Sequence, residues 1–386
     1  MRRHSRYSAP LAALLLIGVH FGARADLLIS ANDGKAELVN GVNTVPDNPL
    51  PDSVTIIDLA TTPPKVAAEI QMPASLVGPP SSVAIARDES FALVTAATKI
   101  DPADKKKIVP DNIVSVIDLR ASPPNVIATL AAGAGASGVA INRAGTLALV
   151  ANRMEGSVSV FTIAGKALTV AGKIQLGDTK SGPSAVAFTP DGKRALVTRD
   201  GDSTISVLSV DGTKVSPSGR DIHAGLRPYA LGISPRGDFA VVTNGGMGGG
   251  DDDTMSLIDL TANPPRTVDT VTVGASPESM TIAPDGRHIA VTVINGTNRP
   301  KDSPFFHARG RMPVFEVRQM KLVKVTEAPI GRWCQGAGWN KSSTLILMQC
   351  IVEQEIEMFK FDGKTLTPAG VIKVKGGPAG IATTPG

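Results

Sequence analysis

The sequence is poor in aromatic residues and cysteines. Only 4% of its 386 residues are aromatic, and it has two Cys. Few aromatic side chains make a base-stacking platform or an aromatic sugar cleft a poor fit. No Cys-x-x-Cys-His sequence is present, which excludes a c-type cytochrome. A glycine-rich phosphate loop, a Gly-x-Ser-x-Gly elbow and a His-Glu-x-x-His helix motif are also absent.

The net charge is small once the N-terminal segment is set aside. The whole chain has 39 basic and 35 acidic residues, but residues 1–25 contain four Arg and no acid. The remaining residues carry 35 of each sign. A neutral protein offers no electrostatic reason to bind nucleic acid or an anionic membrane. We therefore expect neither nucleic acid nor membrane insertion.

Residues 1–25 have the three parts of a secretory signal peptide. Arg2, Arg3 and Arg6 are followed by an apolar stretch from Leu11 to Val19 and by the small-residue sequence Ala23-Arg24-Ala25. This order is typical of an export signal cleaved before Asp26. The apolar stretch is too short to span a bilayer. The prediction is a signal peptide over 1–25, one domain over 26–386, and a periplasmic or secreted location.

A repeat of about fifty residues runs through the rest of the chain. Each copy resembles PSAVAFTPDGKRALVTRDG, two alternating apolar segments around a tight turn, which is typical of a β-hairpin. A second hairpin follows in each unit, with first strands such as SVSVFTI and TMSLIDL. Copies of the first hairpin begin at Pro80, Ala136, Pro183, Pro228, Pro277 and Cys334.

The second hairpin has seven copies and the first has six, and the chain ends resolve this mismatch. Residues 377–386 form a lone first strand that would complete the blade begun by Leu27–Ser30. The sequence therefore predicts an all-β fold, a seven-bladed β-propeller of four-stranded blades, closed by pairing of the N- and C-terminal strands. Closure removes the exposed sheet edges of an open array.

Three of the repeats carry a recognisable signature. The sequences LVAN (149–152), LVTR (196–199) and VVTN (241–244), each followed by a strand such as VSVFTI, resemble the YVTN family of bacterial β-propeller repeats. That superfamily includes exported repeat proteins, lactonase-like enzymes and the propeller subunits of amine dehydrogenases. The resemblance implies the fold over essentially the whole mature chain, and it leaves the activity open.

The long insertions all join the second and third strands of a blade, so we expect them on one face of the ring. They cover residues 31–52, 96–112, 245–253 and 295–311. Loops held by a rigid scaffold commonly bind ligands. We expect this decorated face to contact a protein partner or a small anionic ligand.

Two of these loops contain candidate ligand-binding groups. Asp251, Asp252 and Asp253 follow a glycine run and are candidate Ca²⁺ ligands, although a solvated acidic turn is the simpler interpretation. No other cofactor is expected. In the sequence PFFHARGR, His307, Arg309 and Arg311 form a basic cluster suited to a carboxylate or phosphate. A surface loop pinned by its two Phe residues is the alternative.

A further set of Asn and Arg residues recurs at strand ends or blade links around the predicted central funnel. Several Arg converging on a channel would favour an anionic ligand. The alternative is that these side chains hydrogen-bond to neighbouring blades. The candidates are Asn152, Arg153, Arg199, Arg227 and Asn244.

The only two cysteines, Cys334 and Cys350, lie symmetrically about the turn of one hairpin. They should therefore face each other across two strands. Export to an oxidising compartment predicts a disulfide between them.

No catalytic constellation stands out, so the leading hypothesis is an exported, non-catalytic binding or scaffolding module. One alternative is a lactonase-like hydrolase that uses the funnel. Its acid and base groups would come from Asp200, Glu278, His223 or Arg227. Another alternative is the propeller subunit of a periplasmic redox complex.

Overall fold

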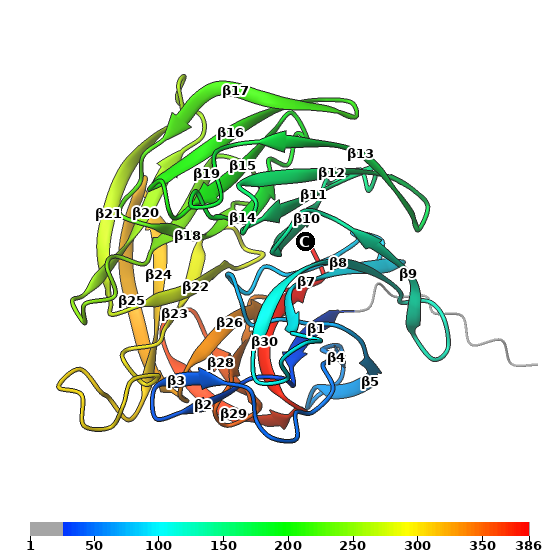
Figure 1. Cartoon of the computed structure of the whole chain (residues 1–386). Helices are drawn as coiled ribbons and strands as arrows, with labels where there is room; N and C mark the ends of the chain where they lie inside the picture. The colour runs from blue at the N-terminus through cyan, green and yellow to red at the C-terminus, as the bar shows by residue number, and fades with distance from the viewer. Residues whose placement is uncertain (1–25, 386) are drawn as a thin grey trace, which may run out of the picture.

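The computed structural model describes residues 26–385, which form seven four-stranded sheets arranged as a ring (Figure 1). This confirms the predicted seven-bladed β-propeller. The predicted signal peptide, residues 1–25, lies outside the described residues. Between residues 26 and 385 there is no helix long and apolar enough to cross a membrane.

Each blade is an antiparallel sheet of four strands. The first strand named lies at the central channel and the last lies at the outer edge. Blade 1 consists of β30 (Gly377–Thr383), β1 (Leu27–Asp33), β4 (Ser53–Asp58) and β5 (Lys65–Gln71). Blade 2 consists of β6 (Val83–Ile85), β7 (Phe91–Ile100), β8 (Ile108–Asp118) and β9 (Asn125–Ala131). Blade 3 consists of β10 (Ala136–Ile141), β11 (Leu147–Asn152), β12 (Ser157–Ala164) and β13 (Ala167–Gln175). Blade 4 consists of β14 (Pro183–Phe188), β15 (Arg194–Arg199), β16 (Thr204–Asp211) and β17 (Lys214–Ile222).

The remaining three blades continue the same order. Blade 5 consists of β18 (Pro228–Ile233), β19 (Phe239–Asn244), β20 (Asp253–Asp259) and β21 (Arg266–Gly274). Blade 6 consists of β22 (Pro277–Ile282), β23 (His288–Val293), β24 (Gly310–Arg318) and β25 (Lys321–Ile330). Blade 7 consists of β26 (Cys334–Trp339), β27 (Leu345–Cys350), β28 (Glu355–Phe361) and β29 (Leu366–Lys373).

The ring closes through the two ends of the chain, as predicted. Strand β30 pairs antiparallel with β1, and the two lie side by side in red and blue in Figure 1. The amide of Thr384 donates to the carbonyl of Leu27 at 2.9 Å, and the amide of Leu27 donates to Thr384 Oγ1 at 3.0 Å. No blade is therefore left without its innermost strand, and both ends of the array are paired.

Apolar side chains fill the space between neighbouring blades. Between blades 2 and 3, Phe91 and Leu93 pack in one cluster with Val150 and Phe161, all at most 2% exposed. Each such side chain contributes roughly 1.5–3 kcal/mol when it is fully buried. Since both faces of each sheet contact another sheet, consecutive residues of an inner strand are buried, as in β11, where all six residues are buried.

Two of the predicted long loops contain paired strand residues. In blade 1, β2 (Glu37–Val39) and β3 (Val42–Thr44) form a hairpin. Its turn is Asn40-Gly41, with φ of 45° and 81°, the combination that a two-residue hairpin turn requires. In blade 2, β7 and β8 continue past the sheet and remain paired as far as Ile100 and Ile108. Both insertions are therefore ordered hairpins.

Candidate functional site

The second residue of each innermost strand occupies the same place in successive blades, near the mouth of the channel on the decorated face. From blade 3 to blade 7 these residues are Ser137, Ser184, Tyr229, Glu278 and Gln335. The side chain is small in blades 3 and 4 and large and polar in blades 5, 6 and 7. The mouth is therefore chemically asymmetric although the backbone repeats.

Arg153 and Asp200 form a bidentate ion pair between blades 3 and 4. Arg153 Nη1 and Nη2 lie 2.7 and 2.8 Å from the two carboxylate oxygens of Asp200. The Asp200 side chain is 3% exposed and also accepts a hydrogen bond from Ser184 Oγ at 3.0 Å. Bidentate geometry fixes the guanidinium plane as well as its position. Asp200 therefore orients Arg153 at the mouth.

Arg227 approaches the same carboxylate from the link to blade 5. Its Nη2 lies 3.4 Å from Asp200 Oδ2, and its side chain is 46% exposed. The backbone of Arg227 has φ of 55°. The left-handed region costs a residue with a Cβ about 1 kcal/mol or more. Such conformations persist where the surrounding structure requires them, and they cluster at functional sites.

The left-handed residue recurs at the start of the innermost strand in blades 3 to 7. In blades 3 and 4 it is glycine, which adopts this conformation without strain. In blades 5, 6 and 7 it carries a side chain instead. These residues are Gly135, Gly182, Arg227, Ser276 and Trp333, in chain order.

Tyr229 lies beneath Arg153. The guanidinium carbon of Arg153 is 5.4 Å from the centre of the Tyr229 ring, within the range of a cation–π contact. Thr198 Oγ1, from blade 4, donates to the Tyr229 carbonyl at 2.8 Å and holds this strand in place. Burial raises the pKa of the Tyr229 phenol, and the nearby Glu278 charge acts in the same direction. The phenol therefore remains neutral and able to donate a hydrogen bond.

Glu278 has the most strongly shifted carboxyl at the mouth. Burial raises its pKa to about 7, against the opposing effects of the Arg153 charge and of hydrogen bonds from Gln335 and Tyr229. The Gln335 amide, in the orientation that satisfies both of its ends, donates to Glu278 Oε1 at 3.2 Å and accepts from Trp333 Nε1 at 3.1 Å. A carboxyl with this pKa can both accept and return a proton near neutral pH.

The arrangement can therefore bind and transform a polar substrate. A titrating carboxyl, a neutral phenol and a guanidinium lie together at the mouth, which is the combination needed to move a proton and stabilise a developing oxyanion. We refer to Arg153, Asp200, Tyr229, Glu278 and Gln335 as the mouth cluster. Sequence reasoning considered Arg153 as a ligand-binding residue and Asp200 and Glu278 as acid/base candidates. It missed Tyr229 and Gln335, although comparing the equivalent positions of the repeats would have found both.

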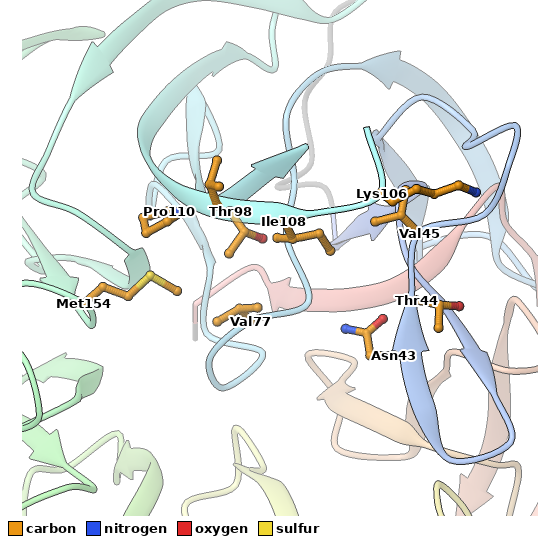
Figure 2. A pocket seen from close by; sticks show the side chains of 10 residues that line it. Asn43, Thr44, Val45, Val77, Thr98, Lys106, Ile108, Pro110 and Met154 are labelled. Carbon is orange, nitrogen blue, oxygen red and sulfur yellow. The ribbon is translucent and has the colours of Figure 1, made fainter. Parts of the chain in front are cut away.

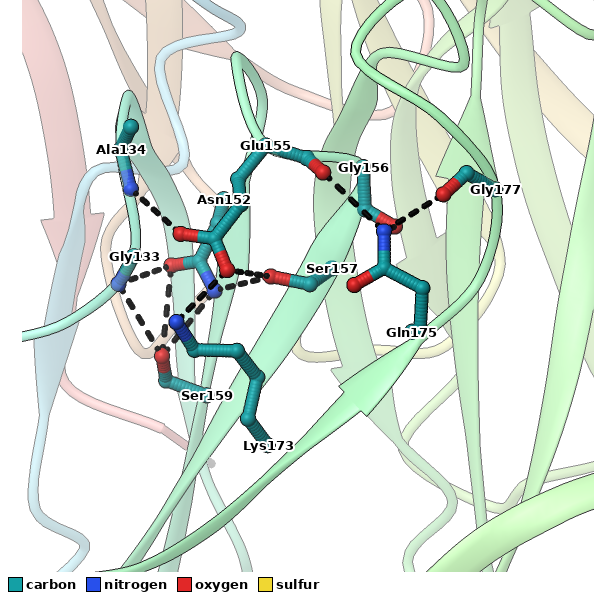
Figure 3. A network of polar contacts seen from close by, with 10 residues as sticks. All are labelled: Gly133, Ala134, Asn152, Glu155, Gly156, Ser157, Ser159, Lys173, Gln175 and Gly177. Carbon is teal, nitrogen blue, oxygen red and sulfur yellow. Dashed lines mark hydrogen bonds and ion pairs between the residues drawn. The ribbon is translucent and has the colours of Figure 1, made fainter.

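Asn152, Asn244 and Arg199 occupy equivalent positions at the end of the second strand, where they brace their own blades. The Asn152 Nδ2 donates to Ser157 Oγ at 2.9 Å and to Ser159 Oγ at 3.0 Å (Figure 3). Asn244 makes the same pair of bonds in blade 5, to Thr254 and Ser256, at 3.0 Å each.

In blade 4, Arg199 replaces the Asn of this brace. It donates to Ser206 at 3.0 Å and is ion-paired with Asp202 and Asp221. The structure therefore places Arg153 and Arg227 together on Asp200, whereas Arg199 pairs elsewhere. A ligand-binding role for Asn152, Asn244 and Arg199 stays a prediction.

The basic residues of the blade 6 loop do not share one partner. Arg311 forms a bidentate pair with Glu327 at 2.8 and 2.9 Å. Arg309 is exposed and lies 3.8 Å from Glu357, and His307 is exposed. An anion site built from His307, Arg309 and Arg311 likewise stays a prediction.

The acidic loop is only partly turned towards the protein. Asp253 Oδ2 accepts from the Ser276 amide at 2.9 Å, whereas Asp251 and Asp252 are exposed. Burial raises the pKa of Asp253. Over residues 26–385 no group of three or more His, Cys, Asp or Glu side chains is arranged to hold a metal ion. His223, the remaining acid/base candidate, is exposed at the start of the link to blade 5.

The predicted disulfide is present. Cys334 and Cys350 are directly paired on β26 and β27 and are joined as a disulfide, with a Cα–Cα distance of 3.9 Å. Both residues are fully buried. Because Cys334 lies between Trp333 and Gln335 in the chain, the disulfide anchors the strand that presents Gln335.

Comparison with known proteins agrees with this architecture. Residues 115–226 match the family model described as lactonase, 7-bladed beta-propeller. Over this segment the chain is similar to that family. The matched segment contains Arg153, Ser184 and Asp200 of the mouth. No curated protein matches the sequence.

Solved structures with the same fold include enzymes named as lactonases. A periplasmic gluconolactonase of Pseudomonas aeruginosa is 15% identical, with a TM-score of 0.65, over 93% of this chain and 98% of that one. A candidate 6-phosphogluconolactonase of Bacteroides fragilis is 17% identical, with a TM-score of 0.70, over 94% and 99%. The hydrazine synthase of Kuenenia stuttgartiensis is 19% identical, with a TM-score of 0.62, over 80% and 90%. At these identities the likeness shows the fold alone.

Taken together, the comparisons favour the hydrolase alternative over the leading hypothesis of a non-catalytic module.

Proposed function

We propose that the protein is an exported hydrolase that opens a lactone ring at the mouth cluster. The observation that carries this proposal is Glu278, a carboxyl with a pKa of about 7 placed beside Arg153 and Tyr229. The lactonase family match and the periplasmic gluconolactonase with the same fold support the reaction class. The disulfide and that periplasmic structure support export.

The chemistry follows from the charges at the site. The Glu278 carboxylate takes a proton from water, whose oxygen attacks the lactone carbonyl carbon. The carbonyl oxygen becomes an oxyanion, which the Arg153 guanidinium and the Tyr229 hydroxyl stabilise. The ring C–O bond then breaks, and the protonated Glu278 returns its proton to the departing oxygen. The product is a hydroxy acid, with one water consumed.

Neighbouring residues keep these groups in position. Asp200 holds the Arg153 guanidinium through two hydrogen bonds. Gln335 holds one Glu278 oxygen, and Trp333 in turn holds the Gln335 amide. We therefore assign Asp200, Gln335 and Trp333 as positioning residues.

The test is hydrolysis of gluconolactone and simple γ-lactones, followed by proton release between pH 5.5 and 7.5 and corrected for spontaneous opening. We expect kcat/KM to rise with pH through about 7, because the base must be deprotonated. Glu278→Gln should lower kcat at least about 100-fold. The matched control is Glu69→Gln on the outer strand β5, whose carboxylate pairs with Lys375 at the surface. Equal activity in the two variants would exclude Glu278 as the base.

Binding of a protein partner remains a second candidate function, because apolar side chains are exposed on the decorated loops. Val39 and Val42 at the tip of the β2–β3 hairpin are 50% and 60% exposed, and Met247 is 76% exposed. Such residues on one face favour docking of another protein. Native purification from the periplasm would test it, since a stoichiometric co-purifying protein is expected only for this function.

A further inference from the structure

The long loops of the decorated face join into a continuous wall. Arg299 in the loop of blade 6 donates to the Gly248 carbonyl in the loop of blade 5. Pro300 packs so closely against Gly41 that a Cβ there would lie 2.4 Å from its ring. Lys106 in the hairpin of blade 2 pairs with Asp47 in the loop of blade 1. The wall therefore runs over blades 5, 6, 7, 1 and 2.

A pocket of about 690 Å³ lies where this wall meets blades 1, 2 and 3 (Figure 2). Figure 2 shows Met154 on one side of it, Asn43 and Thr44 on the other, and Val77 and Ile108 between them. Most of the lining is aliphatic or thioether, the surface that binds an apolar group. The apolar lining residues are Val45, Val77, Ile108, Val109, Pro110 and Met154.

Three of the four polar residues that line this pocket, Thr44, Thr98 and Lys106, have partners of their own. Thr98 Oγ1 lies 2.8 Å from Ser75 Oγ, and both side chains are buried. Lys106 is paired with Asp47, and its side chain is 59% exposed. Thr44 Oγ1 donates to the Glu37 carbonyl at 3.4 Å, and the Asn43 amide is exposed at the rim. The pocket therefore offers a mostly apolar surface with one amide at its rim.

The pocket adjoins the mouth of the channel at two points, one of them beside the mouth cluster. Met154 follows Arg153 directly in the chain, so one side of the pocket begins beside the ion pair with Asp200. Val77 precedes Gly78, which packs against the side chain of Ser137, the mouth residue of blade 3. A molecule held at the mouth cluster can therefore extend into the pocket without leaving the wall.

The charges at the mouth favour a neutral substrate. Arg153 and Arg227 share the single carboxylate of Asp200, and Arg199 is paired with Asp202 and Asp221. Glu278 adds a negative charge when it is ionised. A phosphorylated substrate would have to displace or share these carboxylates, since each Arg is already paired.

We propose that this pocket binds an apolar substituent of a neutral lactone whose ring lies at the mouth cluster. The inference deepens the proposed function and rests on it. It assigns Val77, Ile108 and Met154 as specificity-determining residues. Each buried methylene is worth about 0.8 kcal/mol, which corresponds to a factor of about 4 in binding. Met154 adds an adaptable side chain at the junction with Arg153.

The test compares γ-lactones that differ only in the length of an alkyl substituent, from none to about eight carbons. Hydrolysis is measured with the parent protein, and binding is measured by calorimetry with Glu278→Gln, so that affinity is obtained without turnover. We expect both kcat/KM and affinity to rise by about two- to fourfold per methylene until the pocket is full. Gluconolactone 6-phosphate should be the poorest substrate.

Two variants make the pocket polar. Ile108→Asp and, at the exposed rim, Pro110→Asp should remove the dependence on chain length. Ile108→Leu should preserve that dependence. Val371→Asp, an exposed position on β29, is the control for adding a charge elsewhere.

The failures of the two proposals are distinguishable. Lactone hydrolysis that depends on Glu278 but not on chain length would overturn the pocket and leave the proposed function intact. Binding that grows with chain length and is lost in Ile108→Asp, without hydrolysis, would support the pocket and overturn the reaction. A preference for the phosphorylated lactone would overturn the inference of a neutral substrate.

Discussion

The two halves of the channel mouth have the same backbone and different chemistry. In blades 3 and 4 the link residue is glycine and the next mouth residue is serine. In blades 5, 6 and 7 the link residue has a side chain, and the mouth residue is Tyr229, Glu278 or Gln335. A repeat can therefore carry an asymmetric site when a few equivalent positions change and the hydrogen-bonded frame stays constant.

Asp200 links the two halves, because it pairs with Arg153 of blade 3 and with Arg227 at the start of blade 5. Breaking these pairs should have the largest effect on the frame. Asp200→Asn leaves two guanidiniums facing an uncharged amide at a position that is 3% exposed. Loss of one partner of a fully buried pair costs 3–5 kcal/mol, and partial exposure of both Arg reduces this to about 2–3 kcal/mol. Urea denaturation should show that loss, and lactone hydrolysis should fall by at least about tenfold.

Asp202→Asn is the matched control for this change. Asp202 is 30% exposed and pairs with Arg199, outside the mouth cluster. Its substitution should cost under about 1 kcal/mol. Equal losses of stability in both variants would show that Asp200 is an ordinary surface partner.

The raised pKa of Glu278, in blade 6, should make the free energy of unfolding depend on pH. Because the folded pKa is about 7 and the ordinary value is 4.5, the folded protein holds a proton that the unfolded chain has released between these values. The free energy of unfolding therefore falls as the pH rises from about 4.5 to 7. Glu278→Gln should remove this fall and be more stable than the parent above pH 7, by on the order of 2 kcal/mol.

Thermal unfolding at a series of pH values measures this difference. Ser137→Ala, at the equivalent position of blade 3, has no titrating group and should keep the parent's pH dependence. A pH-independent difference between Glu278→Gln and the parent would contradict the raised pKa.

Arg227→Gly converts the link of blade 5 into the type found in blades 3 and 4. It removes the left-handed strain at φ of 55° together with one guanidinium near Asp200. We expect the free energy of unfolding to change by less than about 1 kcal/mol, because relief of strain and loss of the pair offset each other. Catalytic efficiency should fall about tenfold. Unchanged efficiency would show that Arg227 has only a backbone role.

The braces at the second strand should affect stability alone. Asn152→Ala removes the bonds to Ser157 and Ser159 and leaves buried polar atoms unpaired, at a cost of about 1–2 kcal/mol. The variant Asn244→Ala removes the corresponding pair of bonds and should cost less, because Asn152 Oδ1 also accepts from the Gly133 amide at 2.9 Å. A fall in kcat/KM after either change would give these residues the ligand-binding role predicted from the sequence.

The fold was readable from the sequence because each local signal agreed with the next. Alternating apolar strands, Pro-Asp-Gly turns and the missing first hairpin together required a closed ring of seven blades. The disulfide followed from the symmetric placement of Cys334 and Cys350 about one turn. The Asn40-Gly41 hairpin lies inside the predicted loop over residues 31–52, although Asn-Gly is a strong local turn signal.

The candidate site was only partly readable. Arg153, Asp200, Arg227 and Glu278 were all identified from the sequence as candidates, but as members of separate hypotheses. Their convergence depends on the curvature of the ring, which brings links from blades 3, 4 and 5 to one mouth. Arg199 lies apart from Arg153 because the two are not equivalent in the repeat. Arg199 occupies the position of Asn152, and Arg153 is one residue further along.

The sequence by itself determined the repeat, the number of blades and the pairing of the chain ends, because strand periodicity and turn residues are local properties. The tertiary structure alone decided which polar side chains share a site, which Arg is paired with which carboxylate, and where the wall encloses an apolar pocket. Those outcomes depend on distances between blades, and burial at the mouth then sets the pKa of Glu278.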